Sequence, residues 1–210
     1  MNPPATVIVL AAGLGSRFAG VGHKLAQTLD GQGDAGVVLS VTLRNAIASR
    51  LPVLVVTSAE LAPLARQQVA ARDVLILPPL RGRGMGDSIA AGVSARPDAS
   101  GWLVLPADMP RVRPATLQQV AQALGTHAVA YAQYRGLRGH PVGFSAELYS
   151  ELTALTGEEG ARRLVSRYPA QAVEVDDPGM LVDIDTVQDL AALRAVQGGS
   201  AAATLDGTPR

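Results

Sequence analysis

Lys24 is the only lysine in a sequence that holds seventeen arginines. A lysine ammonium is a compact point charge and an arginine guanidinium is a broad planar fork, so the two are not interchangeable where phosphate is held. Lys24 follows a glycine-rich stretch, residues 13–17, whose main-chain N–H groups could approach an anion and whose Arg17 would add charge. We therefore expect Lys24 and Arg17 to hold a polyphosphate. The alternatives are chance survival of one lysine and an ordinary tight turn.

The glycine-rich stretch does not match the two commonest nucleotide-binding loops. It lacks the G-x-x-x-x-G-K-[ST] pattern of the Walker A loop. Phe18 stands where the dinucleotide-binding fingerprint G-x-G-x-x-G needs its third glycine. The sequence therefore argues against both classes of loop.

Three aspartates are candidates for holding a divalent metal ion. Asp108 follows the apolar run at residues 102–105, and a carboxylate just past the carboxyl end of a buried strand lies where open α/β proteins bind ligands. Asp183 and Asp185 are two residues apart, so on a strand they would share a face. Mg²⁺ takes one or two carboxylates together with phosphate oxygens, so Asp108 with one of the other two would suit it. The alternatives are that Asp108 lies in a plain turn and that Asp185 or Thr186 only caps a helix.

A second glycine-rich segment precedes a predicted helix. Gly84 and Gly86 flank Met85, and Ser88 follows shortly after them. Glycines allow a flat ring to lie against the main chain, and the Ser88 hydroxyl could hydrogen-bond to it. We expect these four residues to bind a nucleobase. The alternative is an ordinary loop in which Asp87 or Ser88 caps the helix.

Alternating apolar runs and helical patterns predict the elements that would position these residues. Strands are expected over residues 6–11, 52–57, 73–77, 102–105, 128–133, 172–175 and 181–184. Helices are expected over residues 37–50, 59–71, 87–95, 146–154, 158–167 and 187–196, and one more near Pro114, with a loop over 138–141. This order predicts parallel β-α-β units. We expect one domain over residues 1–196 and a disordered tail over residues 197–210.

Composition excludes several other classes of function. The chain has 210 residues, a formal net charge of zero and no cysteine. A nonspecific nucleic-acid binder would show a basic excess, and a disulfide or thiolate metal site would need cysteine. The sequence has neither an apolar run of membrane-spanning length nor a secretory signal at its start, so we expect a cytoplasmic protein with no membrane or nucleic-acid partner.

Several segments together resemble one enzyme family. The first loop resembles the L-A-A-G-x-G-x-R…K signature of sugar-nucleotide and cofactor nucleotidyltransferases, and the matching residues are Leu10, Ala11, Ala12, Gly13, Gly15, Arg17 and Lys24. Residues 84–88 resemble the G-M-G-x-S base-reading loop of the molybdenum cofactor cytidylyltransferases, a branch of the MobA-like NTP transferase family. Residues 105–110 and 183–190 resemble the L-x-x-D-x-P metal motif of the family and the D-I-D-T-x-x-D-L element of the branch.

Two weaker matches concern the acceptor substrate. Residues 138–144, which include His140 and Pro141, resemble the G-x-P segment of the family near the acceptor. Residues 156–162 resemble an L-x-G-D-x-G-A-R segment in which Glu158 replaces the usual aspartate. The resemblance covers residues 6–193, and its main departure is the polar and glycine-rich stretch 26–36.

The resemblance implies a Rossmann-like three-layer α/β/α fold with a mainly parallel central sheet. It implies Mg²⁺-dependent transfer of CMP from CTP to molybdopterin, with release of pyrophosphate. In this reading Lys24, Arg17 and Asp108 are catalytic, and Asp108 binds the metal with Asp183 or Asp185. The acceptor would lie near His140, Pro141 and Glu158, and a molybdoenzyme would be the client for the product.

Rival functions remain open within the resemblance. The guanylyltransferases of the family tend to carry L-A-G-G and G-P-L-x-G at the two glycine loops, so both loops of this chain favour CTP. The enzyme alternatives are guanylyl transfer to molybdopterin and transfer to a sugar or polyol phosphate. The other alternative is a relative that binds a nucleotide or cofactor without turnover, against which the intact Lys24, Arg17 and Asp108 argue.

Overall fold

A seven-stranded sheet forms the centre of the protein, in the order β3-β2-β1-β4-β6-β5-β7. The computed structural model describes residues 4–13, 15, 18–20, 22–29, 36–78 and 84–202, with side chains to residue 195. The strands are β1 (Thr6–Ala11), β2 (Val53–Thr57), β3 (Val74–Ile76), β4 (Gly101–Pro106), β5 (Val129–Tyr134), β6 (Leu137–Ser145) and β7 (Ala170–Glu174). Strands β3, β2, β1 and β4 run parallel to one another, as do β5 and β7. The prediction of a mainly parallel sheet is confirmed.

Apolar side chains cover both faces of the parallel half. In β1, Val7 and Val9 pack into one core and Ile8 packs into the other, and all three are fully buried. A strand with helices on both sides needs apolar residues along its length, which is why residues 7–11 are a continuous apolar run.

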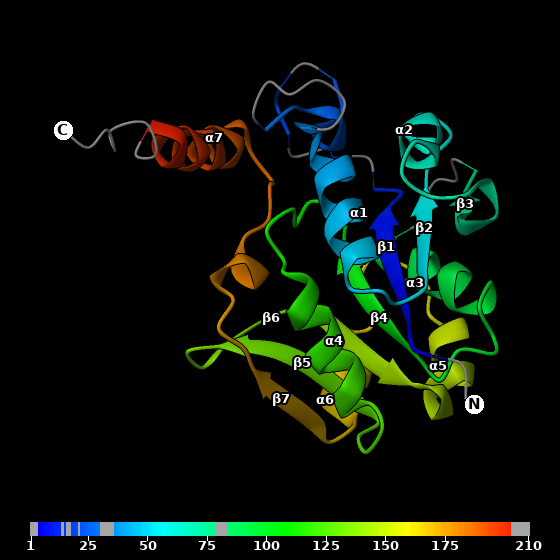
Figure 1. Ribbon diagram of the computed structural model, residues 1–210. Helices are drawn as coiled ribbons and strands as arrows, with labels where there is room; N and C mark the ends of the chain where they lie inside the picture. The colour runs from blue at the N-terminus through cyan, green and yellow to red at the C-terminus, as the bar shows by residue number, and fades with distance from the viewer. Residues whose placement is uncertain are drawn as a thin grey trace.

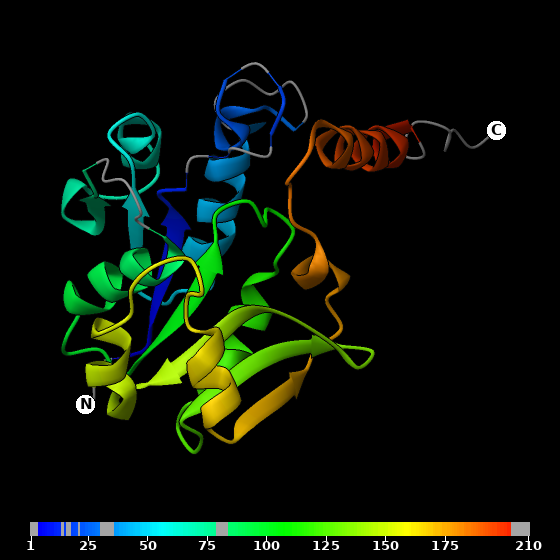
Figure 2. The same ribbon diagram turned by 180° about the vertical axis from the view of Figure 1, so that it is seen from behind.

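Helices flank both faces of the sheet. One face carries α1 (Val38–Ala48) and α4 (Pro114–Ala123), in front of the strands in Figure 1, and α2 (Ala62–Arg66) packs into the same core beyond the end of β2. The other carries α3 (Met85–Ser94), α5 (Tyr149–Thr153) and α6 (Arg162–Arg167), in front of the strands in Figure 2. The last helix, α7 (Val187–Ala202), projects sideways from the upper edge and places Leu190 and Leu193 in the first core. The three-layer α/β/α prediction is confirmed.

The prediction of a loop over residues 138–141 is wrong, because these residues lie in β6. Strand β6 pairs antiparallel with both β4 and β5. A two-residue turn connects β5 to β6, and both turn residues have positive φ, Arg135 at 50° and Gly136 at 79°. Tight hairpin turns need this conformation and usually recruit Asn-Gly or Asp-Gly. Arg135-Gly136 makes the same turn without Asn or Asp at its first position, so the hairpin could not be predicted from the sequence.

The predicted strand over residues 181–184 is also wrong. Pro178–Leu181 form a 3-10 helix, η5, and residues 182–185 form an irregular connection to α7. Pro178 and Gly179 favour a turn over a ladder. The connection instead makes a single main-chain bond across to the end of β4, from the N–H of Ile184 to the carbonyl of Asp108 at 3.1 Å.

Several helices differ in extent from their predicted ranges. Residues 59–71 give only the short α2, and residues 146–154 give a 3-10 turn, η4 (Ala146–Leu148), before α5. Helix α6 begins at Arg162 rather than 158, because Gly160 takes a positive φ that a helix cannot accommodate. Helix α3 begins earlier, at Met85, and α7 extends to Ala202, into the stretch expected to be disordered. Alanine has the highest helix propensity, so Ala201 and Ala202 favour continuation of the helix. The single domain over 1–196 stays a prediction, and no helix in the described part of the chain could cross a membrane.

A buried carboxylate anchors the connection that carries Asp183 and Asp185. Asp177 accepts hydrogen bonds from the N–H of Arg113 at 2.8 Å, the hydroxyl of Thr116 at 2.6 Å and the N–H of Gly179 at 3.0 Å. It therefore caps the amino end of α4 from a distant part of the chain. A Cβ at Gly179 would collide with the carbonyl of Arg111, so only glycine allows this close approach.

We expect Asp177→Ala to lower the free energy of unfolding by about 2–4 kcal/mol, because it leaves buried donors at the start of α4 unpaired. Urea denaturation followed by circular dichroism would measure the loss. Asp176→Ala is the matched control, since its side chain is exposed and its main-chain carbonyl alone meets Arg113. The control should stay within about 0.5 kcal/mol of the wild-type value. Equal stability of the two variants would contradict the anchoring role.

Candidate active site

The ammonium group of Lys24 lies between two carboxylates at the carboxyl end of the parallel strands. Its Nζ is 2.6 Å from Oδ2 of Asp108 and 2.9 Å from Oδ1 of Asp185. All three side chains are largely buried, with 13%, 17% and 25% of their surface exposed. The structure thus brings together Lys24, Asp108 and Asp185, three residues that the sequence singled out from three distant segments.

Main-chain and side-chain contacts from α1 and β1 fix Asp108. The N–H of Ala107 donates to the carbonyl of Leu10 at 3.0 Å, which continues the pairing of β4 with β1 by one residue. The hydroxyl of Thr42 donates to the carbonyl of Ala107, and the amide of Asn45 donates to the carbonyl of Pro110, both at 2.8 Å. The two sides of Asp108 are therefore held by the sheet and by α1.

His23 fixes the segment that carries Lys24. Its Nδ1 accepts a hydrogen bond from the N–H of Leu25 at 3.1 Å, so Nε2 bears the ring proton and donates to the carbonyl of Gly13 at 3.0 Å. These two bonds link the start of the first loop to η1 (Lys24–Ala26), a single 3-10 turn with buried Leu25. The sequence argument missed His23, whose only signal was its position directly before Lys24.

The described part of the first loop leaves room for a ligand. A Cβ at Gly13 would meet no atom within 4 Å, and Gly15 takes the left-handed conformation at φ +61°. Leu10 and Ala11 use their carbonyls within the sheet, accepting from Ala107 and from the Thr57 hydroxyl, while Ala12 is partly exposed at the strand end. Arg17 lies outside the described residues.

The start of α7 orients Asp185. Oδ2 of Asp189 accepts from the N–H groups of Asp185 at 3.2 Å and Thr186 at 2.7 Å. The Thr186 hydroxyl accepts in turn from the N–H of Asp189, so the cap expected at Thr186 is present. Hydrogen bonds from Thr186, and to a smaller extent from the N–H of Asp185, lower the pKa of the Asp189 carboxyl. The carboxylate that caps α7 therefore stays charged. Asp183 is exposed and lies near His140 instead.

The charges of this cluster reinforce one another. Burial by itself would lower the pKa of Lys24, but hydrogen bonds and charge attraction from Asp108 and Asp185 outweigh it and raise the pKa. Lys24 is therefore an ammonium at neutral pH. Oδ1 of Asp108 is buried, and no hydrogen-bond donor approaches it within the described ranges. A buried carboxylate oxygen with a free lone pair is costly unless a cation or donor reaches it.

This donor set fits a Mg²⁺ or Mn²⁺ ion. Asp108 and Asp185 offer two carboxylates, and the described residues contain no group of three or more His, Cys, Asp or Glu side chains of the kind that would make a complete protein cage. Mg²⁺ prefers such sparse sites, where phosphate oxygens and water complete its coordination. Asp185 therefore fits the second metal position better than Asp183.

The second glycine segment packs closely against another part of the chain. Gly84 and Gly86 are buried, and a Cβ at either position would collide with the main chain of residues 156–158. Their lack of side chains thus admits another segment of the protein, and contact of residues 84–88 with a nucleobase stays a prediction. The Ser88 hydroxyl is buried and donates to the carbonyl of Gly84 at 3.3 Å, so it is already engaged within α3. Of these residues, Met85 is the exposed one, with 45% of its surface accessible.

A large cavity of about 1060 Å³ lies between α3, β6 and α6. Ile89, Val142, Phe144 and Val165 are among its apolar lining residues, while Arg138, His140, Glu158 and Arg162 are among its polar ones. Because β6 runs antiparallel to β4, its first half lies at the same sheet edge as Asp108. Arg138, Gly139 and His140, which line the cavity, therefore lie at the same edge of the sheet as the Lys24 cluster. Two of the three expected acceptor residues, His140 and Glu158, line it, and Pro141 is buried behind His140.

The electrostatic character of the cavity comes from His140 and the arginines. Burial, followed by the positive charge of Arg138, lowers the pKa of His140 to about 4, although Asp183 opposes the shift. His140 is thus neutral at pH 7, with one nitrogen able to donate and the other able to accept. Arg138 stacks over Tyr131 at 4.6 Å, which leaves the edge of its guanidinium available to an anion.

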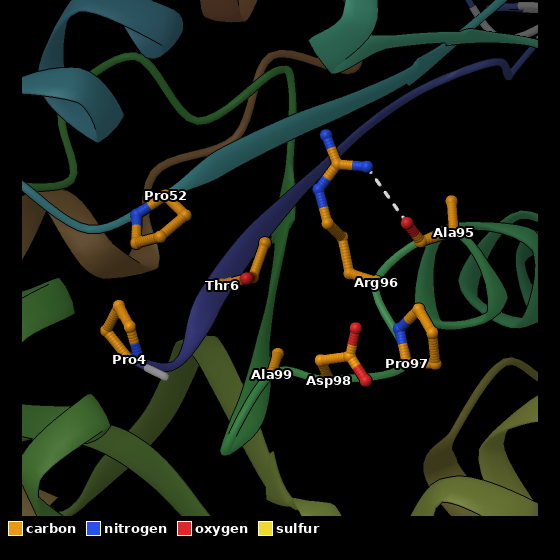
Figure 3. A pocket seen from close by; sticks show the side chains of 8 residues that line it. All are labelled: Pro4, Thr6, Pro52, Ala95, Arg96, Pro97, Asp98 and Ala99. Carbon is orange, nitrogen blue, oxygen red and sulfur yellow. Dashed lines mark hydrogen bonds between the residues drawn. The ribbon is translucent and has the colours of Figure 1, made fainter. Parts of the chain in front are cut away.

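A second hollow lies at the opposite edge of the sheet. Figure 3 shows its eight lining residues, among them Pro4 and Thr6 at the start of β1, and its volume is about 240 Å³. Of its two charged side chains, Arg96 and Asp98, Arg96 is used within the protein, where it donates to the carbonyl of Ala95 and pairs with Asp73 at 2.7 Å. Ligands in open α/β folds bind at the carboxyl ends of the strands, so this hollow is not the active site.

Comparison with known proteins agrees with this geometry. Residues 7–173 match the MobA-like NTP transferase domain. The chain is 32% identical to the purine catabolism protein PucB of Bacillus subtilis (strain 168), over 92% of this chain and 97% of that protein. It is also 32% identical to the phosphoenolpyruvate guanylyltransferase of Mycolicibacterium vanbaalenii, over 80% of this chain and 79% of that enzyme.

A solved structure shares the fold over nearly its whole length. Rv0371c from Mycobacterium tuberculosis H37Rv superposes with a TM-score of 0.78 at 25% identity, and the match covers 93% of this chain and 99% of that one. The same protein has also been solved in complex with manganese, with a TM-score of 0.73. The matched domain and the two relatives show that this chain is a nucleotidyltransferase that belongs to the MobA-like NTP transferase family.

Proposed function

We propose that the protein transfers CMP from CTP to molybdopterin in a Mg²⁺-dependent reaction that releases pyrophosphate. The observation that carries the proposal is the cluster of Lys24 with Asp108 and Asp185 beside a large, partly cationic cavity. A phosphorylated acceptor in the cavity would face a nucleotide whose phosphates lie over the first loop. The choice of CTP rests on the resemblance of residues 10–13 and 84–88 to the cytidylyl branch.

In the proposed reaction, an oxygen of the acceptor phosphate attacks the α-phosphorus of CTP. A new P–O bond forms to the acceptor, and the bond to the leaving pyrophosphate breaks. Such reactions require alignment of the two phosphates and neutralisation of charge rather than covalent catalysis by the protein. When bound, Mg²⁺ would supply charge neutralisation and fix the geometry of the phosphate oxygens. Asp108 and Asp185 would hold it.

Lys24 supplies the protein's own charge to this reaction. Its ammonium lies at the centre of the site and carries three donors, so a small side-chain rotation would transfer it from the carboxylates to phosphate oxygens. The open space above Gly13 lets the phosphate chain approach the main chain closely. Arg17, which lies between Gly13 and Lys24 in the sequence, would add a second cation.

The cavity supports a bulky acceptor with an anionic end. Its apolar floor, which includes Val142 and Phe144, suits a flat ring system, and its volume of about 1060 Å³ is at the upper end of the range for small-molecule sites. Arg138 and Arg162 at its rim could hold a phosphate. Neutral His140 could hydrogen-bond to the polar edge of a pterin as either donor or acceptor.

A second candidate is guanylyl transfer to a small phosphorylated acid. One relative is named as a phosphoenolpyruvate guanylyltransferase, and this chain shares 32% of its residues with that enzyme over the aligned range. The large apolar cavity argues against so small an acceptor. Incubating the protein with Mg²⁺, each NTP and either molybdopterin or phosphoenolpyruvate, and measuring pyrophosphate, separates the two reactions.

The metal assignment predicts different effects for two neighbouring aspartates. Asp185→Asn should weaken Mn²⁺ binding by about tenfold or more, because it replaces a carboxylate ligand with an amide. Asp183→Asn should change the affinity much less, since Asp183 is exposed and Lys24 pairs with Asp185 instead. Titration of Mn²⁺ followed by electron paramagnetic resonance, with CTP present, measures both. The reverse order of effects would assign the metal to Asp183 instead.

The base assignment predicts a higher kcat/KM for CTP than for GTP with molybdopterin as acceptor. A site built to hydrogen-bond a pyrimidine would exclude the larger purine and leave its own polar groups unpaired against it. Steady-state release of pyrophosphate at matched concentrations of the two nucleotides gives the ratio. Use of GTP with CTP inert would refute the cytidylyl assignment and leave the broader nucleotidyltransferase function intact.

A further inference from the structure

One carboxylate joins the amino end of α3 to the loop Thr156–Gly160. Oδ2 of Asp87 accepts hydrogen bonds from the main-chain N–H groups of Gly84 and Gly157, both at 2.9 Å. The N–H of Gly86 donates to the carbonyl of Gly157 at 2.8 Å. Gly157 therefore both donates to and accepts from the start of α3, although it lies 70 residues from Asp87 in the chain.

Glycines on both sides make this contact close. A Cβ at Gly84 would collide with the main chain of Gly157, and one at Gly86 would lie 2.7 Å from the carbonyl oxygen of Thr156. Gly157 has φ +70°, a conformation that side chains disfavour. The two segments thus meet main chain to main chain, so neither can shift without breaking hydrogen bonds to the other.

The bond from Asp87 to Gly157 is not needed to form α3. A residue at the third position of a helix completes a capping box by accepting from the N–H of the N-cap, here Gly84. The additional bond to Gly157 stabilises nothing within the helix. It ties the helix start to a loop that leads into α6, the helix that forms the far wall of the cavity.

Both joined segments line the same cavity. Met85 contributes to it from the α3 side, and Glu158, Glu159 and Ala161 contribute to it from the loop. The space beside Gly160 is filled by Met85, because a Cβ there would lie 3.1 Å from the Met85 sulfur. A shift of Met85 would therefore change the packing around Gly160 on the opposite wall of the cavity.

We infer that Asp87 is a positioning residue that couples the nucleotide side of the cavity, residues 84–86, to the acceptor side, residues 157–161. A nucleotide bound against Met85 restricts the motion of the start of α3. The hydrogen bonds of the Asp87 carboxylate then restrict the motion of residues 157–161 as well. The inference rests on the proposed function, since it takes residues 84–86 to contact the nucleotide. Coupling of binding is reciprocal, so the acceptor strengthens nucleotide binding by the same factor.

Hydrogen–deuterium exchange of the full-length chain, with and without Mg²⁺ and CTP, tests the coupling without needing the acceptor. In the wild-type chain, CTP should slow exchange in peptides that cover residues 84–94 and also in those that cover 154–164, each by about fivefold. In Asp87→Ala the first peptide should keep its slowing and the slowing of the second should fall clearly, although the bond from Gly86 to Gly157 remains. Asp73→Ala is the control, because it removes a carboxylate paired with Arg96 at the opposite sheet edge, and it should behave as the wild type.

Circular dichroism establishes that each variant is folded. If Asp87→Ala unfolds, Asp87→Ser decides the matter, since its hydroxyl is shorter than the carboxylate that accepts from both Gly84 and Gly157, and it should transmit a clearly smaller slowing than the wild type. Wild-type slowing confined to residues 84–94, or full transmission in the folded Asp87 variant, would overturn the inference. Absence of any slowing near residues 7–26 and 84–94 with both CTP and GTP would overturn the proposed function, and this inference with it.

Discussion

The pairing of the Lys24 ammonium with the carboxylates of Asp108 and Asp185 is the interaction on which the site depends. Two carboxylates this close together repel each other strongly in a partly buried setting, where unit charges 4 Å apart interact by about 4 kcal/mol. A cation between them removes that repulsion and draws together segments from the first loop, the end of β4 and the start of α7. The same feature suits the site to a reaction in which negative phosphates must approach each other.

Contacts from several parts of the surrounding fold hold these three groups in place. Thr42 and Asn45 of α1 fix the chain on both sides of Asp108, and His23 fixes the first loop against η1. Asp177 and Asp189 do the same for the connection that carries Asp185. The contacts of Thr42, Asn45 and Asp177 join segments that are more than 60 residues apart in sequence, so the geometry of the site is largely a tertiary property.

The parts of the structure that followed from the sequence are those set by local pattern and by strand polarity. A continuous apolar run predicted β1, and the rule that parallel strands end at one edge predicted that Asp108 would lie near the first loop. The Arg135-Gly136 turn lacks the usual hairpin residues, so β6 was missed, and with it the reason why His140 lies beside the cavity. Asp183 and Asp185 lie in a connection without regular structure. Hydrophobic periodicity predicts helices and strands only, so it could not show which of the two lies beside Lys24. For Gly84 and Gly86, the sequence indicated a close approach to the main chain, but not that the approaching group would be residues 156–158.

The central claim is that Asp108 helps to hold the metal ion at which transfer occurs. The most direct test is pyrophosphate release by Asp108→Asn compared with the wild-type chain, at saturating Mg²⁺, CTP and molybdopterin, with circular dichroism to establish that both are folded. The account predicts a loss of about a hundredfold or more in turnover, the scale expected when a group that stabilises transition-state charge is removed. Near-normal turnover by the folded variant would contradict it.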